Sequence, residues 1–160
     1  WWLLGDGRRS GGAQQGGGRA YDVYKGQACC AGVWKVVGVV GDCFATFDGG
    51  AWATAIASQC SGVVLAGATP IGREVASRVA AKRGVPIVQD ATGLAAGITI
   101  TRPIYSGKAV ETSTVTGECV ITLRANAFEA AGAGGSAAVN VVNQSADVGI
   151  AFKEAIAQAS

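Results

Sequence analysis

The stretch that most constrains the fold is residues 62–87, GVVLAGATPIGREVASRVAAKRGVPI. Residues 62–68 form a continuous apolar run of strand length, which is typical of a parallel strand covered on both faces. In residues 71–83 apolar side chains recur at helical spacing, and charged side chains take the other side. A second strand begins at Pro86. A strand, a helix and a strand in so short a span predict a right-handed crossover unit of a parallel sheet.

The ends of this predicted helix carry their own signals. Thr69 stands where an N-cap belongs, and Pro70 takes the first helical position, where its missing N–H is not needed. Lys82 and Arg83 fall in the last turn, where their charge suits the helix dipole, and Gly84 stops the helix. The helix is therefore predicted to begin after Thr69 and to end before Gly84.

The turn between this strand and the helix is also a candidate anion site, formed by Thr69, Gly72 and Arg73. Free N–H groups and the helix dipole both favour negative charge at a helix N-terminus that follows a parallel strand. Nearly every crossover helix offers the same features, so a simple helix cap explains these residues as well. Both interpretations, a ligand site and a capped turn, stay open at the level of the sequence.

The composition is typical of a compact domain and excludes several classes of function. Hydrophobic residues make up 49% and charged residues 15% of the 160 residues, a length that predicts a single domain over 1–160. The net charge is only +2 and Lys and Arg are scattered, which argues against a nucleic-acid partner. Apolar runs fall far short of the roughly 20 residues of a membrane span, so direct membrane insertion is not expected.

The chain lacks histidine, and this limits its chemistry. Ser-His and Cys-His nucleophile pairs are impossible within it. The five cysteines include no C-x-x-C pair, so no metal site is expected, and reduced thiols fit a cytoplasmic (bacterial) or mitochondrial-matrix location. Carboxylates such as Glu74, Asp90, Glu111 and Glu118 occur singly, without the paired pattern of general acid–base catalysis. No residue is therefore assigned as catalytic.

After Gly97 the pattern changes from helical spacing to an alternation with period two. Residues 98–128 read ITITRPIYSGKAVETSTVTGECVITLRANAF, with turn sequences at 106–108 and 116–118. This pattern predicts an antiparallel meander of three strands over residues 98–125. The remaining expected elements are strands at 1–4, 21–25, 33–41 and 139–142, a helix at 52–59 and a helical turn at 152–159.

From about residue 31 to residue 129 the chain resembles the N-terminal domain of the electron transfer flavoprotein alpha subunit. Four segments carry the resemblance, in the order and spacing of that family: GVWKVVGVVGD, GVVLAGATPIGREVASRVAAKRGVPIVQDATGL, TRPIYSGKAVETS and VITLRANAFEAA. Residues 1–30 match poorly, and residues 130–160 are expected to be a linker toward an FAD-binding domain absent from this chain. The expected fold is α/β and three-layered, with a mostly parallel sheet flanked by helices (adenine-nucleotide-hydrolase-like) and an antiparallel meander extension.

The resemblance implies part of an electron carrier with one FAD, built from an alpha and a beta subunit, and not an enzyme with its own substrate turnover. Such a carrier accepts electrons from flavin dehydrogenases, such as the acyl-CoA dehydrogenases of fatty acid beta-oxidation, and passes them to a quinone oxidoreductase. In this family the FAD is held mainly by the second domain of the alpha subunit, and AMP belongs to the beta subunit. The flavin performs the redox step, while the protein supplies binding and electrostatics.

Three residues of the matched region are candidate interface residues. Tyr105 and Lys108 lie at a hairpin turn, where turn chemistry and contact with a neighbouring domain or subunit both fit the sequence. The family has Asn where this chain has Lys108. Arg124 interrupts an apolar strand end, and an arginine in that position needs a carboxylate or phosphate partner, which favours a domain interface.

The alternative function is a small adenine-nucleotide-binding α/β domain with a sensing or regulatory role. The expected meander separates the two hypotheses, because a plain nucleotide-binding domain has no need of it. The absence of a second glycine-rich phosphate loop also weighs against the sensor. The sequence therefore favours the electron carrier.

Overall fold

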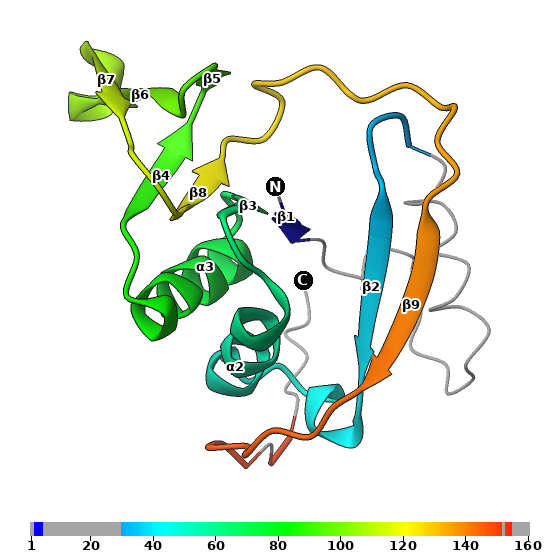
Figure 1. The fold of residues 1–160 in the computed structure, drawn as a ribbon. Coiled ribbons are helices and arrows are strands. Elements are labelled where there is room, and N and C mark those ends of the chain that lie inside the picture. The colour runs from blue at the N-terminus through cyan, green and yellow to red at the C-terminus, as the bar shows by residue number, and fades with distance from the viewer. Residues whose placement is uncertain (1, 5–29, 152, 155–160) are drawn as a thin grey trace, which may run out of the picture.

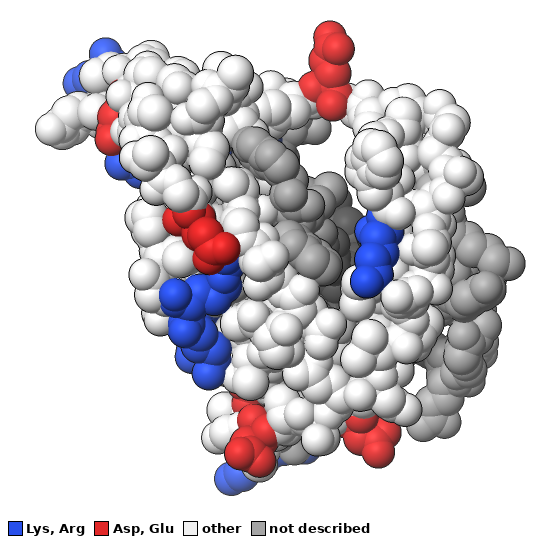
Figure 2. All heavy atoms as spheres, viewed as in Figure 1, with Lys and Arg blue, Asp and Glu red and all other residues white. Residues whose placement is uncertain are grey.

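The computed structural model describes residues 2–4, 30–151 and 153–154 (Figure 1). The predicted strand at 21–25 and most of the predicted turn at 152–159 lie outside these residues. None of the helices in this part of the chain is long and apolar enough to cross a membrane. Figure 2 shows Lys, Arg, Asp and Glu as small separate groups on a largely uncharged face.

A four-stranded parallel sheet lies at the centre of the fold, with the strand order β1-β3-β8-β4. Its strands are β1 (Trp2–Leu4), β3 (Val63–Gly67), β8 (Cys119–Leu123) and β4 (Ile87–Ala91). The strands predicted at 1–4, at 62–68 and after Pro86 are confirmed. Because β8 lies between β3 and β4, the two strands of the predicted crossover unit share one sheet but are not neighbours.

The predicted three-stranded meander over 98–125 is wrong in its third strand. That segment is β8, which joins the parallel sheet, and its four side chains from Cys119 to Thr122 are completely buried. Burial on both faces in the middle of a sheet outweighs the local turn at 116–118, which favoured pairing with the preceding strand. Thr122 is accommodated there because its hydroxyl accepts a hydrogen bond from the Asp90 N–H at 2.8 Å.

The antiparallel extension is nevertheless present as a separate sheet with the order β5-β6-β7. Its strands are β5 (Gly93–Ala95), β6 (Thr99–Ile104) and β7 (Ala109–Thr114), and a short 3-10 turn, η3 (Tyr105–Gly107), joins the last two. Figure 1 shows this sheet at one end of the molecule, beyond β4. Ile100 of β6 is buried with Ile121 of β8, and this contact ties the extension to the parallel sheet.

The predicted helix after Thr69 is confirmed at both ends as α3 (Pro70–Arg83). Thr69 Oγ1 accepts a hydrogen bond from the Gly72 N–H at 3.0 Å. Gly84 ends the helix in a left-handed conformation, with φ of 65°, which glycine adopts without steric cost.

The other helix, α2 (Gly49–Gln59), begins three residues earlier than predicted. Asp48 caps it and accepts hydrogen bonds from the Gly50 and Ala51 N–H groups at 2.7 and 3.0 Å. α2 packs against α3 (Figure 1). The helices and the sheet enclose the main core, which includes Ala53, Val64, Val75, Val79 and Val120.

A further two-stranded parallel sheet pairs β2 (Lys35–Val40) with β9 (Ala138–Asn143). Both strands lie where the sequence predicts them, and η2 (Asp42–Phe44) follows β2. The chain after β9 stays close to α2, because the Gly149 N–H donates to Asp48 at 2.8 Å. The described part of the chain has mostly parallel sheets, two α-helices and one antiparallel sheet, and this confirms the predicted α/β fold class.

Candidate functional site

Three charged residues meet at the carboxyl edge of the parallel sheet. Two of them are predicted site residues, and both contact the third. Arg124 follows β8, Arg73 lies in the first turn of α3, and Asp90 belongs to β4. Arg124 Nε donates to Asp90 Oδ1 at 3.1 Å, and its Nη2 donates to Asp90 Oδ2. Arg73 Nη2 lies 3.4 Å from Asp90 Oδ1. The predicted carboxylate partner of Arg124 is therefore Asp90, within this chain.

An irregularity in β4 places Asp90 between the two arginines. The register of β4 against β8 shifts between Val88 and Ala91, and Asp90 has a left-handed conformation with φ of 64°. Aspartate tolerates this conformation better than most residues. The Asp90 N–H, freed from the regular ladder, donates to the buried Thr122 hydroxyl. The bulge thus fixes the carboxylate at the edge of the sheet, where both guanidinium groups reach it.

The cluster keeps a net positive charge. The hydrogen bond from Arg124 holds the pKa of Asp90 below its ordinary value, and the charges of Arg124 and Arg73 act in the same direction. The same hydrogen bond raises the pKa of Arg124. Two cations around one carboxylate leave one positive charge, and the Arg73 and Arg124 side chains are 48% and 45% exposed. The arrangement can accept a further anionic group from solvent or from a neighbouring chain.

The other two residues of the candidate anion site have direct structural roles. Thr69 caps α3 through its hydroxyl, and its carbonyl oxygen accepts the Arg73 N–H at 2.8 Å. A Cβ added to Gly72 would lie well under 3.0 Å from the Gly67 carbonyl oxygen, so only glycine fits between α3 and the end of β3. The helix-cap interpretation of Thr69 is confirmed, and the ligand interpretation stays a prediction.

Tyr105 and Lys108 lie elsewhere, at the turn between β6 and β7. Tyr105, Ser106 and Gly107 have successive positive φ angles of 50°, 55° and 84°, a costly conformation for the first two residues. The turn is closed by the Lys108 N–H, which donates to the Tyr105 carbonyl oxygen at 3.2 Å. The Tyr105 side chain is 78% exposed. The predicted hairpin turn is confirmed, and it presents an aromatic side chain to solvent.

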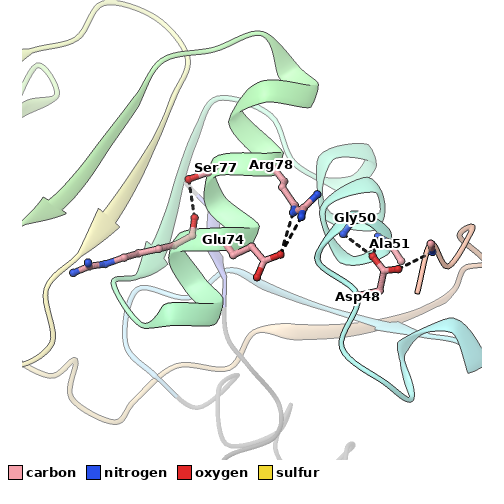
Figure 3. Close-up of polar contacts among 8 residues, drawn as sticks. Asp48, Gly50, Ala51, Glu74, Ser77 and Arg78 are labelled. Carbon is pink, nitrogen blue, oxygen red and sulfur yellow. Dashed lines mark hydrogen bonds and ion pairs between the residues drawn. The ribbon is translucent and has the colours of Figure 1, made fainter. Parts of the chain in front are cut away.

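Sequence reasoning missed two acidic residues that organise this molecule. In the sequence Asp90 is a single carboxylate, and only the strand order shows that it joins Arg73 to Arg124. Asp48 is buried and accepts hydrogen bonds from three N–H groups, two of them in α2 and the third that of Gly149. Figure 3 shows Asp48 with its two donors in α2, and the Glu74–Arg78 pair of α3 lies in the same view. Its signal was present in the sequence, because Asp directly before an alanine-rich helix is a strong N-cap.

A surface cavity of about 580 Å³ lies where α2, α3 and the segment after β9 meet. Two aspartates, Asp48 and Asp147, and two cations, Arg78 and Lys82, contribute to its wall. A flavin ring needs a largely apolar wall, and its diphosphate needs free N–H donors. The first N–H groups of α2 are already taken by Asp48. The cavity therefore does not fit FAD, and no chemical step through a flavin is assigned to these residues.

The fold and the site define a small α/β domain that gathers polar side chains at the carboxyl ends of its parallel strands. Comparison with known proteins gives the family: the chain belongs to the electron transfer flavoprotein domain family, whose model matches residues 15–148. The resemblance seen in the sequence is thereby confirmed.

Individual relatives agree with this assignment. Over 88 residues the chain is 41% identical to the electron transfer flavoprotein subunit alpha of Bradyrhizobium diazoefficiens, which covers 54% of this chain and 28% of that protein. The subunit alpha of Paracoccus denitrificans is 35% identical over 88 residues, with coverage of 54% and 29%. A probable mitochondrial subunit alpha of Caenorhabditis elegans is 36% identical over 96 residues, with coverage of 59% and 29%. The chain spans less than a third of the length of these relatives.

Proposed function

We propose that this chain acts as the N-terminal scaffold domain of an FAD-containing electron carrier of the alpha-subunit type. The observation that carries the proposal is the family match over residues 15–148, which includes α2, α3 and every strand of the parallel sheet except β1. In this proposal the carrier accepts electrons from flavin dehydrogenases, such as acyl-CoA dehydrogenases in fatty acid beta-oxidation. It passes them to a quinone oxidoreductase and turns over no substrate of its own.

The flavin belongs to another part of the carrier in this proposal. The charged cavity beside α2 does not suit FAD, which agrees with a flavin held mainly by a domain outside this chain. The carrier is a heterodimer with a beta subunit, and that subunit holds AMP. Its proposed location is the bacterial cytoplasm or the mitochondrial matrix, because its relatives include bacterial and mitochondrial proteins.

Two surfaces of this domain are proposed to contact neighbouring domains or subunits. The first is the cluster of Arg73, Asp90 and Arg124, whose uncompensated charge suits a carboxylate on the opposing surface. The second is the β6–β7 turn, where Tyr105 stands exposed beside Lys108. Tyrosine and arginine contribute more than most residues to interface energy, because each buries a large, rather rigid surface and still forms hydrogen bonds.

The alternative, a nucleotide sensor, has one observation in its favour, which is the pair of exposed arginines beside the start of α3. A phosphate group could bind there with Arg73 and Arg124 as donors. The carrier and the sensor differ in size and colour, so one measurement separates them.

The test is a denaturing mass spectrum of purified protein together with a visible absorption spectrum of the same sample. The carrier predicts a species heavier than 15.9 kDa, a second subunit and a flavin band near roughly 450 nm. A colourless species of 15.9 kDa that binds AMP or ATP would refute the carrier and support the sensor.

Interface residues are tested by co-purification with the beta subunit. Tyr105→Ala and Arg124→Gln should each weaken retention of that subunit. Val141→Ala, which alters a residue 52% exposed on β9, is the matched control and should leave retention unchanged. Equal retention in all three variants would remove both surfaces from the proposal.

A further inference from the structure

The two arginines of the cluster at the carboxyl edge of the parallel sheet are not equivalent. Arg124 donates to both oxygens of Asp90, from Nε to Oδ1 at 3.1 Å and from Nη2 to Oδ2. Arg73 approaches only Oδ1, with its Nη2 at 3.4 Å, which is longer than the roughly 2.7–2.9 Å of a charge-assisted hydrogen bond. Asp90 therefore mainly neutralises Arg124, and most of the excess positive charge of the cluster lies on Arg73.

The Arg73 guanidinium is accessible and keeps donors for another group. Its side chain is 48% exposed, and within the described residues Asp90 is its one carboxylate contact, made through Nη2. A guanidinium carries five N–H donors in a planar fork, so Arg73 has donors left for a second carboxylate. Arg78 lies on the same helix and is 52% exposed, but its Nε and Nη2 both contact Glu74 at 3.2 Å (Figure 3). Of these two arginines, Arg73 is the one that can bind a further anion.

The backbone that carries Arg73 is held in place from two sides. Its N–H donates to the Thr69 carbonyl oxygen at 2.8 Å. Its carbonyl oxygen accepts the Ser77 hydroxyl at 2.8 Å, and that hydroxyl accepts the Gln89 side-chain amide at 3.1 Å. Gln89 and Asp90 are neighbours on β4, so this one strand holds the start of α3 at two points. A group that is already held in place loses less conformational freedom when it binds a partner.

The charge of the cluster selects the kind of anion that it can bind. With Asp90 ionised, the three side chains carry one net positive charge. A carboxylate would bring this sum to zero, and its two oxygens match two parallel N–H donors of a guanidinium. A phosphate dianion would reverse the sign, and it would lie beside the Asp90 carboxylate, which repels it. The observations thus favour a carboxylate over a phosphate group.

On the basis of the function proposed above, we propose that Arg73 is the residue of this domain that binds a carboxylate of the beta subunit. Arg124 is a positioning residue, because it occupies both oxygens of Asp90 and so leaves the charge of Arg73 for the partner. Without Arg124, Asp90 would turn to Arg73, the other cation that contacts it, and neutralise it. The interface thus depends on Arg73 directly and on Arg124 through Asp90.

The test is binding of purified variants to the beta subunit of the same carrier, measured by surface plasmon resonance at several salt concentrations. Arg73→Gln should raise the dissociation constant roughly tenfold, the value of one charge-assisted hydrogen bond. It should also flatten the dependence of the association rate on salt, and Arg73→Lys, which keeps the charge, should restore that dependence. Arg78→Gln is the matched control, because it removes the same charge from the same helix. It should change the dissociation constant by less than about twofold.

A double variant separates the roles of the two arginines. If Arg124 acts through Asp90, Arg124→Gln should weaken binding in the wild type but should cause no further loss in Arg73→Gln. If Arg124 binds the partner itself, the two losses should add, and that result would overturn the assignment.

The assignment is also overturned if Arg73→Gln binds the beta subunit as tightly as the wild type, or if Arg73→Lys does not restore the salt dependence. The function proposed above is judged separately, by the wild-type protein. A wild type that binds no beta subunit would refute the carrier and this assignment together. A wild type that binds it no better than Arg73→Gln does would refute the assignment alone.

Discussion

Substitution of Gly72 by alanine should destabilise the protein strongly, although alanine is the better helix former. The new Cβ would lie well under 3.0 Å from the Gly67 carbonyl oxygen and 3.0 Å from Thr69 Oγ1. The first turn of α3 must then move away from β3, but Val75 and Val79 of the same helix are buried in the core. Forced overpacking costs about 1–3 kcal/mol or more, and alanine returns at most about 1 kcal/mol of helix propensity. Because the overlap with the Gly67 carbonyl oxygen is severe, the cost lies at the upper end of that range, about 3 kcal/mol, and we expect a net loss of about 2 kcal/mol.

Urea denaturation followed by circular dichroism measures this loss. With a slope of about 2 kcal/mol per M, the unfolding midpoint of Gly72→Ala should fall by about 1 M. Gly50→Ala is the matched control, because it also lies in the first turn of a helix and its Cβ would meet only Asp48 Oδ1, at 3.1 Å. The control should unfold within about 0.5 M of the wild type. If Gly72→Ala matched the control, the close approach of α3 and β3 would not be the reason for glycine there.

Three further predictions concern the core, the cluster of Arg73, Asp90 and Arg124, and the segment after β9. Ile121→Ala should cost about 2–5 kcal/mol in chemical denaturation, because β8 is buried on both faces, whereas Val110→Ala on the exposed face of β7 should change stability by less than about 0.5 kcal/mol. The pKa of Asp90 is lowered from 3.8, chiefly by its hydrogen bond with Arg124. Ionised Asp90 therefore contributes its full stabilisation to the folded protein above pH 3.8. This contribution is lost as the pH falls through the lower pKa that Asp90 has in the folded protein. Asp90→Asn should therefore be less stable than the wild type near neutral pH, and their stabilities should converge at the acid end of a denaturation series. Asp48→Ala should speed limited proteolysis after β9, because the Gly149 N–H loses its acceptor, and an unchanged cleavage rate would refute this role.

Local sequence signals predicted the elements whose causes are local. The bounds of α3 follow from the cap at Thr69, the proline at its first position and the glycine at its end, and the structure agrees at each point. The start of α2 was predicted three residues too late, although Asp48 carries a signal of the same kind. The turn at Tyr105 was found, but the consecutive positive φ angles that expose this side chain were not visible in the sequence.

The candidate site depended on contacts between distant segments. The sequence predicts separate roles for Arg73 and Arg124, the first as an anion ligand and the second as an interface residue. They meet because β8 inserts between β3 and β4 and because a bulge in β4 places Asp90 at the edge. The same holds for Arg83 and Glu118, which form an ion pair at the opposite edge although they lie 35 residues apart along the chain. No spacing rule along the chain predicts either contact.

The sequence by itself determined the family, the α/β class and the position of most helices and strands, because hydrophobic period, caps and turns act over a few residues. The tertiary structure alone decided which strands pair. A segment such as Cys119–Leu123 is apolar enough for either an antiparallel hairpin or the centre of a parallel sheet. The second arrangement buries both of its faces, and that larger removal of apolar surface from water overrides the local turn before it.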